Sequence, residues 1–298
     1  MNIYIYDPET ANHLFITQML ECELKKFNNT YNVEIIKSLP TENSNIQHSR
    51  YKKNVYFIFL NLYFLHSTNK QVKDDFKKLC NEKYKILYIT EPIQIEVEKK
   101  LYINAINQLK PNKILTYSKG NYNKLNTYHK LIKFYPINTN YLNISTISLI
   151  HLKTRNTQET IFLCKLNEHR KQVINTFSQS NIKIIEDCWT KEEWANILNK
   201  HIFYLNIHRR KDCPCLETMR VYPILYNGGV IISSIVNQEE MNELEKYNIY
   251  FCKENEMENK LLELQKNINY EEILKKTNLF RNQKNEDMKI IYDYLSLL

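Results

Sequence analysis

The chain has 298 residues, of which 43% are hydrophobic and 25% charged; this balance is typical of a globular protein, and the length allows two domains of ordinary size. The formal net charge of +8 indicates attraction to anions such as nucleotides, nucleic acids or acidic surfaces, without choosing among them. The seven cysteines follow no repeating frame, which favours reduced thiols and excludes a small disulfide scaffold.

The apolar segments are too short to insert in a membrane. The longest apolar run, residues 55–65, contains Asn61 and falls well short of the roughly 20 residues that a bilayer-spanning helix needs. Asp7 and Glu9 interrupt the apolar start, so no signal peptide is predicted. We therefore expect a cytoplasmic protein without a transmembrane segment.

Short apolar segments alternate with helical ones through the first half of the chain. Strands are predicted at 2–6, 31–36, 54–61, 85–90, 113–117 and 132–135. Helices are predicted from Thr10, over 70–81, over 95–109 and from about 121. Alternation at this spacing is typical of a doubly wound parallel sheet. The sequence therefore predicts a Rossmann-like N-terminal domain over residues 1–140.

The alternation restarts after residues 137–158, which lack a clear period and are interpreted as a linker. Strands are predicted at 159–165, 182–186, 202–207, 230–233 and 249–252. Helices are predicted over 168–179, 192–198 and 238–246, from Leu216 to the Gly228-Gly229 turn, and near the C-terminus. This pattern predicts a second Rossmann-like domain over 155–298. The expected fold class is α/β, with two facing doubly wound domains.

The strand at 202–207 is followed by a basic loop. His208, Arg209, Arg210 and Lys211 lie at its carboxyl end, where ligands bind in open α/β sheets. Cationic side chains that precede the N-terminus of a helix form a favourable environment for a phosphate group, because both the side chains and the free backbone N–H groups can bind its oxygens. The alternative interpretation is a solvated charged face.

Two further groups carry polar side chains that suit a ligand. Asn206 lies on the same face of its strand as His208, whose ring can bind a phosphate or sugar hydroxyl or be satisfied locally. Asn167 and Arg170 follow the strand at 159–165, and a guanidinium there can bind two phosphate oxygens. A helix-surface arginine is the alternative.

Glu217 and Arg220 lie three residues apart at the start of a helix. An ion pair between them on the helix surface is one interpretation, and a pair that holds a ligand is the other. Asp7 follows the first strand and is a candidate base, although Asp-Pro is also a common turn.

Several segments together resemble the GT-B glycosyltransferases of bacteria and large DNA viruses. The segments that carry the resemblance are 203–208, 216–220, 228–233, 86–92, Tyr117-Ser118 with Asn121, and Pro136. The resemblance implies a nucleotide-sugar donor, a UDP- or GDP-sugar, held mainly by the C-terminal domain. The acceptor, a hydroxyl on a glycan, protein or small molecule, would lie against the N-terminal domain near Asp7, Asn61 and Glu91.

The resemblance also implies roles for individual residues. Glu217 corresponds to the first acidic residue of the family's donor-binding EX7E pattern, but the second acidic position falls at Leu225. This departure leaves the ribose contact and the stereochemical outcome open. The expected catalytic residues are Asp7 and Glu217. The residues expected to bind the donor are Asn167, Arg170, Asn206, His208, Arg209, Arg210, Arg220, Gly228 and Gly229.

No metal site is predicted. Cys213 and Cys215 lie near His208, but one such pair falls short of the four ligands that zinc usually takes, and the chain has no Asp-x-Asp motif. We therefore expect a metal-independent hexosyl- or pentosyltransferase that needs no cofactor beyond its co-substrate and has no nucleic-acid partner. The alternatives are a nucleic-acid-binding protein and a catalytically silent GT-B-like scaffold.

Overall fold

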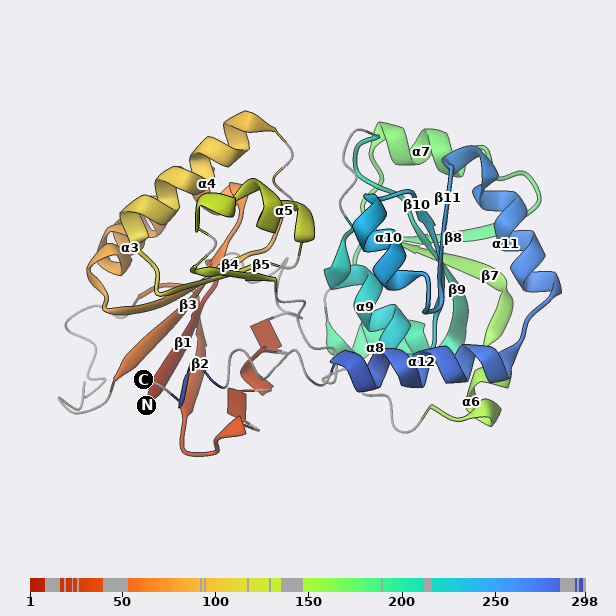
Figure 1. Cartoon of the computed structure of the whole chain (residues 1–298), viewed down its shortest axis with the longest axis horizontal. Helices are drawn as coiled ribbons and strands as arrows, with labels where there is room; N and C mark the ends of the chain where they lie inside the picture. The colour runs from red at the N-terminus through yellow and green to blue at the C-terminus, as the bar shows by residue number, and fades with distance from the viewer. Residues whose placement is uncertain are drawn as a thin grey trace. The chain divides into compact units, whose positions relative to one another are not determined.

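The computed structural model divides into two compact units, Met1–Ile137 and Asn138–Leu298 (Figure 1). The structure describes residues 1–8, 17, 18, 20–22, 24, 25, 27–39, 53–91, 93, 95–116, 118–128, 130–134, 147–188, 190–211, 216–284, 293, 295 and 296. Each unit is built around its own parallel sheet.

The first unit is a doubly wound sheet of six parallel strands. The strands are β1 (Asn2–Tyr6), β2 (Asn32–Ile36), β3 (Asn54–Leu60), β4 (Tyr84–Ile89), β5 (Lys113–Thr116) and β6 (Ile132–Phe134). Their order is β2-β1-β3-β4-β5-β6, so the chain winds one way from β1 to β2 and the other way from β3 onward. β3 and β4 are buried along almost their whole length, which explains their continuous runs of apolar and aromatic residues.

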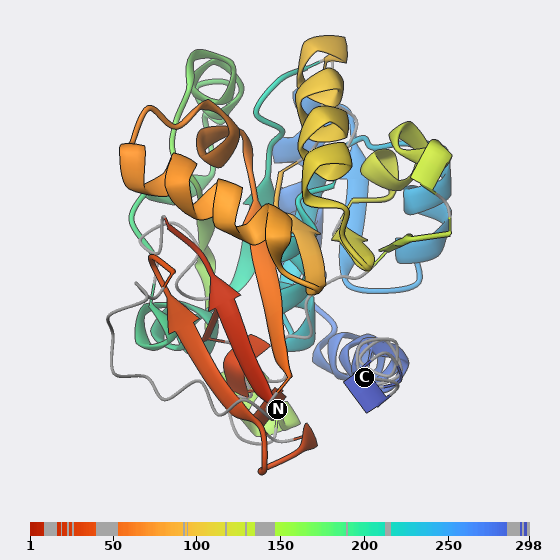
Figure 2. The same ribbon diagram turned by 90° about the vertical axis from the view of Figure 1, so that its left-hand side faces the viewer.

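Helices cover this sheet, and α2, α3 and α5 begin at capping side chains. The described helices are α2 (Leu62–His66), α3 (Lys70–Asn81), α4 (Glu96–Leu109) and α5 (Lys119–Lys124), with the 3₁₀ turn η1 (Asn126–Tyr128). Asn61, Asn69 and Ser118 accept a backbone N–H bond at the starts of α2, α3 and α5, as N-cap residues do. Figure 2 shows α3 and α4 side by side on one face of the sheet.

The second unit repeats this winding with five parallel strands. They are β7 (Asn156–Leu163), β8 (Asn181–Ile185), β9 (His201–Asn206), β10 (Val230–Ser234) and β11 (Ile249–Cys252), in the order β11-β10-β9-β7-β8. The strand order therefore reverses between β7 and β9. All six residues of β9 are buried, as expected for a central strand with both faces covered.

The helices of the second unit complete its core. They are α6 (Leu149–Lys153), α7 (Glu168–Ile174), α8 (Lys191–Lys200), α9 (Thr218–Tyr226), α10 (Gln238–Leu244), α11 (Met257–Lys266) and α12 (Tyr270–Lys284), with the 3₁₀ turn η3 (Glu254–Glu256). The α12 residue Phe280 is 1% exposed. Its ring forms T-shaped pairs with the rings of Tyr222 and Tyr247, at 5.2 Å and 4.9 Å between centroids, an arrangement that aromatic pairs favour.

The fold class predicted from the sequence is confirmed, and every predicted strand is present. The segment interpreted as a linker contains the helix α6, and β7 already begins at Asn156. The helix predicted over 168–179 ends at Ile174. The predicted helix start at Thr10 lies outside the described residues. Among the described helices, none combines the length and the apolar character needed to cross a bilayer.

Candidate active site

The candidate site lies at the carboxyl ends of β7 and β9. These strands pair in parallel, and the strand order of the second unit reverses between them. The crevice outside such a switch point is where open α/β sheets bind ligands. The loop after β7 leads into α7, and the loop after β9 leads to α9, so both loops and both helix starts converge on this edge.

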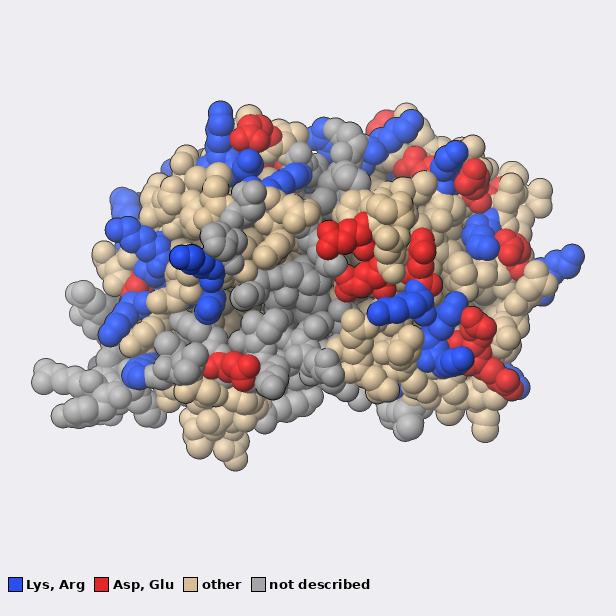
Figure 3. Space-filling model, viewed as in Figure 1, with Lys and Arg blue, Asp and Glu red and all other residues tan. Residues whose placement is uncertain are grey.

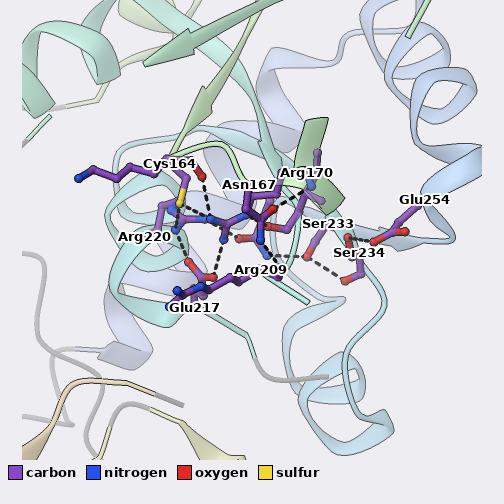
Figure 4. Close-up of polar contacts among 12 residues, drawn as sticks. Cys164, Asn167, Arg170, Arg209, Glu217, Arg220, Ser233, Ser234 and Glu254 are labelled. Atoms are coloured by element: carbon purple, nitrogen blue, oxygen red, sulfur yellow. Dashed lines mark hydrogen bonds and ion pairs between the residues drawn. The ribbon is translucent and has the colours of Figure 1, made fainter. Parts of the chain in front are cut away.

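Arg170 forms the centre of the site and is 4% exposed. Its Nε donates to the Ile207 carbonyl and its Nη1 to the Lys165 carbonyl, each at 3.0 Å, while Nη2 donates to Glu217 Oε1 at 2.9 Å (Figure 4). A buried guanidinium needs such partners because burying an unpaired charge is costly. Arg170 therefore joins the loops after β7 and β9 to the start of α9.

Glu217 occupies the N-cap position of α9 and lies between two arginines. Its Oε1 accepts from Arg170, and its Oε2 accepts from Arg220 Nη2. Burial opposes the ionisation of this carboxyl, but the charges of Arg220 and Arg170, together with that of Arg209, outweigh that effect and lower its pKa. The ion pair considered for Glu217 and Arg220 from the sequence is therefore present, and Arg170 extends it.

Cys164 adds a sulfur atom to this cluster. Its Sγ lies 2.7 Å from Arg170 Nη1 and 2.9 Å from Arg220 Nη2. The two guanidinium groups are thus held together by Glu217 on one side and by Cys164 on the other (Figure 4). Sequence reasoning missed this cysteine, and its position directly after β7 is the one signal that points to it.

Asn206 connects the arginine cluster to β10. Its side chain is 1% exposed, its Nδ2 donates to Ser233 Oγ at 2.9 Å, and its Oδ1 accepts from Arg220 Nη1 at 3.4 Å. Ser233 Oγ in turn donates to the Ser234 carbonyl at 3.0 Å. The amide predicted to bind the donor is therefore engaged by the protein itself, where it fixes the orientation of Arg220.

His208 is buried, with 4% of its surface exposed. Its Nε2 lies 3.1 Å from the Ile235 carbonyl, and Nδ1 has no partner among the described residues. Burial, assisted by the charge of Arg170, lowers the pKa of His208 against the opposing influence of Glu217. The neutral ring therefore donates from Nε2 to the carbonyl and carries a lone pair on Nδ1.

The basic loop after β9 presents its cations to solvent. Arg209, Arg210 and Lys211 are exposed, in contrast to Arg170 and Arg220, whose side chains are 4% and 13% exposed. Asn167 anchors the loop, because its Nδ2 donates to the Arg209 carbonyl at 2.5 Å and its Oδ1 accepts from the Arg170 amide at 2.9 Å. Of the arginines predicted to bind a phosphate, Arg209 and Arg210 are those accessible from outside.

A second polar group lies at the ends of β10 and β11. Glu254 Oε1 is 2.9 Å from His169 Nε2 and accepts from Ser234 Oγ at 3.4 Å, with Ser234 and Glu254 labelled in Figure 4. Sequence reasoning did not select Ser234 or Glu254. Ser234 is the last residue of β10 and Glu254 lies just after β11, and only the strand order shows that they reach the same edge as the basic loop.

Comparison with known proteins gives a clear result for structure and none for sequence. No protein-family model matches the chain, and no curated protein matches it. HepE of Anabaena, solved with UDP and glucose, superposes with a TM-score of 0.64 at 10% identity over 100% of both chains. An alpha-glucosyltransferase with UDP-glucose and DNA containing an abasic site gives 0.64 at 13% identity over 99% of both chains. WaaG, a lipopolysaccharide glycosyltransferase, gives 0.51 at 6% identity over 96% of this chain and 95% of that one.

The chain has the GT-B fold. At sequence identities this low, the structural similarity establishes the fold alone, and it is the fold that the sequence resemblance implied.

Within the GT-B fold, Gly228 and Gly229 lie away from the site. They precede β10 at its amino end, whereas the arginine cluster lies at the carboxyl ends of the strands. Gly228 has φ +78°, and a Cβ at Gly229 would lie 2.3 Å from Ile224 Cγ2 and 2.9 Å from Tyr204 Cε2. The positive φ at Gly228 and the close approach of the backbone at Gly229 give both glycines a packing role, and donor binding by them stays a prediction.

Asp7 belongs to the first GT-B unit and lies at the carboxyl end of β1. Its side chain is 1% exposed, and its amide donates to the Ile36 carbonyl at 3.0 Å. Nearby, Asn61 Oδ1 accepts from the Phe64 amide at 2.6 Å, and Glu91 Oε2 accepts from the Leu62 amide at 3.0 Å. Asn61 and Glu91 therefore position the start of α2 at the edge where the acceptor was expected.

The described residues contain no group of three or more His, Cys, Asp or Glu side chains placed to hold a metal ion. Cys213 and Cys215 lie outside the described residues.

Proposed function

We propose that the chain is a glycosyltransferase that moves a sugar from a nucleotide-sugar donor to a hydroxyl acceptor. The observation that carries this proposal is the basic edge at the switch point between β7 and β9, where exposed Arg209 and Arg210 lie beside the arginine cluster around Glu217. The neighbours solved with UDP or UDP-glucose share the fold over the whole chain. A UDP-sugar is therefore the first donor to test.

The exposed and the buried arginines have different proposed roles in binding the diphosphate. The proposed contacts come from Arg209 and Arg210, because their side chains are exposed to solvent. Arg170 and Arg220 are already committed to Glu217 and Cys164. They act by shaping the edge and by contributing positive potential, which the water-poor interior strengthens.

Glu217 acts in this proposal as the anchor of the two arginines. Both of its oxygens accept from guanidinium groups, so a direct contact with the sugar would compete with those bonds. This assignment differs from the catalytic role that the resemblance implies for Glu217, and it accounts for a site that has one carboxylate where the EX7E pattern has two.

The reaction joins the acceptor oxygen to the anomeric carbon of the donor sugar. The bond from that carbon to the diphosphate oxygen breaks, and the nucleoside diphosphate leaves with the electron pair while the hydroxyl proton passes to a base. Basic side chains stabilise the charge that develops on the leaving group. We keep Asp7 as the candidate base, as proposed from its place after β1, and propose that the reaction needs no metal and transfers a hexosyl or pentosyl group.

Calorimetric titration with UDP, UDP-glucose, GDP and GDP-mannose tests the donor site directly. We expect one nucleotide class to bind, with a melting temperature that rises because about 2.7 kcal/mol of stability is added at a hundred times the dissociation constant. The double variant Arg209→Ala, Arg210→Ala should weaken that binding at least tenfold and leave the melting temperature of the free protein unchanged.

The matched control removes two exposed lysines of the same unit, Lys246→Ala and Lys266→Ala, and should bind like the wild type. Absence of binding for all four ligands would refute the transferase and favour the silent scaffold. Slow hydrolysis of the bound donor without acceptor would separate an active transferase from that scaffold.

A further inference from the structure

The excess positive charge of the chain lies entirely in its first unit. Residues 1–137 contain 20 Lys and Arg against 12 Asp and Glu, whereas residues 138–298 contain 21 of each. Figure 3 reflects this distribution: blue side chains predominate over the unit that carries α3 and α4, and red and blue are interspersed over the unit that carries α10 to α12. An anionic partner would therefore be attracted to the first unit.

Four lysines lead into four neighbouring strands of that unit. Lys53 and Lys83 immediately precede β3 and β4, while Lys110 and Lys130 lie three and two residues before β5 and β6. These strands are consecutive in the sheet order and pair in parallel. Their starts therefore follow one edge of the sheet, about 4.8 Å apart. We call these four residues the lysine row.

The lysine row is available for binding. All four side chains are exposed, and within the described part of the chain none of them forms an ion pair with a carboxylate. The contact recorded for Lys83 is with the ring of Tyr84, 5.2 Å from its centroid. Glu82 is the acidic residue beside the row in sequence, so the edge keeps a clear positive excess.

Backbone contacts fix the spacing of the row. The Asn2 amide donates to the Lys53 carbonyl at 3.0 Å, and the Asn112 amide donates to the Lys85 carbonyl at 2.8 Å. The Ile114 amide donates to the Leu131 carbonyl at 3.0 Å. The starts of the strands are thus tied to one another, and the cations project from a preorganised edge.

Lys110 stands in a conformation that glycine would adopt more easily. It is the C-cap of α4 with φ 48° and ψ 58°, the left-handed region, and a residue with a Cβ there costs roughly 1 kcal/mol or more relative to glycine. The position thus carries a charged side chain at some expense of stability.

We propose that the lysine row binds the phosphate backbone of a single-stranded nucleic acid. A line of point charges along a rigid edge matches a linear polyanion, and lysines that contact phosphates bind without reading sequence. The row lies at the amino ends of the strands, away from the carboxyl edge that holds Asp7, so this inference is independent of the transferase proposal. It replaces the earlier expectation that the protein has no nucleic-acid partner.

The surroundings favour a nucleic acid over an anionic membrane. Docking to a bilayer surface uses apolar side chains together with cations. In the described part of the first unit, the exposed large hydrophobic residues are Ile95, Val97 and Tyr122. These belong to the start of α4 and to α5, which follow the carboxyl ends of β4 and β5, at the other edge from the lysine row.

Fluorescence anisotropy with a labelled 20-nucleotide DNA strand tests the proposal. Four phosphate contacts predict that the logarithm of the binding constant falls against the logarithm of NaCl concentration with a slope of about −3, or roughly 50-fold between 50 and 200 mM. The row variant Lys53→Gln, Lys83→Gln, Lys110→Gln, Lys130→Gln should bring the slope close to zero. A control that removes equal charge, Lys37→Gln, Lys70→Gln, Lys73→Gln, Lys100→Gln, uses exposed lysines elsewhere in the unit and should retain most of the slope.

A single substitution separates binding from folding. Lys110→Gly should reduce the magnitude of the slope by about 0.7 while the melting temperature stays the same or rises, because glycine tolerates the left-handed conformation.

Equal losses in the row variant and the control would overturn the proposal, since net charge alone would then explain binding. Row-dependent binding to vesicles with 30% phosphatidylserine, without binding to the oligonucleotide, would overturn it in favour of a membrane surface.

Discussion

Arg170 Nη2 and Glu217 Oε1 lie 2.9 Å apart, although Arg170 lies in α7 and Glu217 is the N-cap of α9, 47 positions further along the chain. The arginine is 4% exposed and the glutamate 22% exposed, so the pair is largely shielded from water. This contact joins the structure after β7 to the start of α9, and the properties of the site depend on it.

Glu217→Gln should lower the free energy of unfolding by about 3 kcal/mol, because it leaves Arg170 and Arg220 without their shared anion in a largely buried place. Urea denaturation measures this loss. The control is Asp74→Asn, which breaks the exposed pair with Lys77, 4.0 Å apart, and should cost at most about 1 kcal/mol. Similar losses for the two variants would show that the cluster around Glu217 contributes no more than a surface pair.

The contribution of Glu217 should depend on pH. Its pKa in the folded protein is lowered from 4.5, so its stabilisation is fully present above about pH 4.5 and is lost as the pH falls through the folded value. The difference in unfolding free energy between the wild type and Glu217→Gln should therefore be largest near pH 7 and shrink below pH 4.5. A difference that stays constant down to pH 3 would contradict the charge-pair explanation.

His208 should give the protein a second pH dependence at higher pH. Burial lowers the pKa of the ring below 6.5, so its full contribution is present above pH 6.5. As the pH falls, the unfolded chain takes up a proton that the folded ring resists, and stability declines. His208→Gln retains a donor for the Ile235 carbonyl and should show a smaller decline between pH 7 and 5.5. Denaturation curves at several pH values measure it, and parallel declines would assign the effect to His151 and His201, whose pKa values are also lowered.

Gly229→Ala should destabilise the second unit without a selective effect on the donor site. The added Cβ would come within 2.3 Å of Ile224 Cγ2, and overpacking of this kind costs roughly 1–3 kcal/mol. Thermal denaturation and nucleotide titration of the same variant distinguish the two roles. Loss of nucleotide affinity at a temperature where the variant remains folded would instead assign Gly229 to the donor site.

Transferase activity should persist in EDTA, since basic side chains are proposed to neutralise the leaving diphosphate. Radiolabelled sugar transfer, measured with and without the chelator, provides the check. Complete loss that magnesium or manganese restores would show that a metal ion carries this charge.

The fold was largely predictable from the sequence, and the site only in outline. Strands such as β3 and β9 are buried on both faces, so their apolar runs identify them directly. The five-residue helices α2 and α6 are too short to show a helical period. The basic loop after β9 was visible as a run of cations, whereas Cys164 and Glu254 join the site through strand order, which no local pattern encodes. The resemblance placed Gly228 and Gly229 among the donor-binding residues, whereas the structure places them after α9, at the amino end of β10.

The contacts of Phe280 set the order in which the second unit can be completed during synthesis. All five strands have left the ribosome once Cys252 emerges, yet Tyr222 and Tyr247 lack the ring that packs against both until α12 follows. The first unit has its whole sheet by residue 134 and can fold as a separate domain while the rest is being translated. The second unit must wait for α12, so translation that stops within α11 leaves Tyr222 and Tyr247 without the aromatic ring that packs against them.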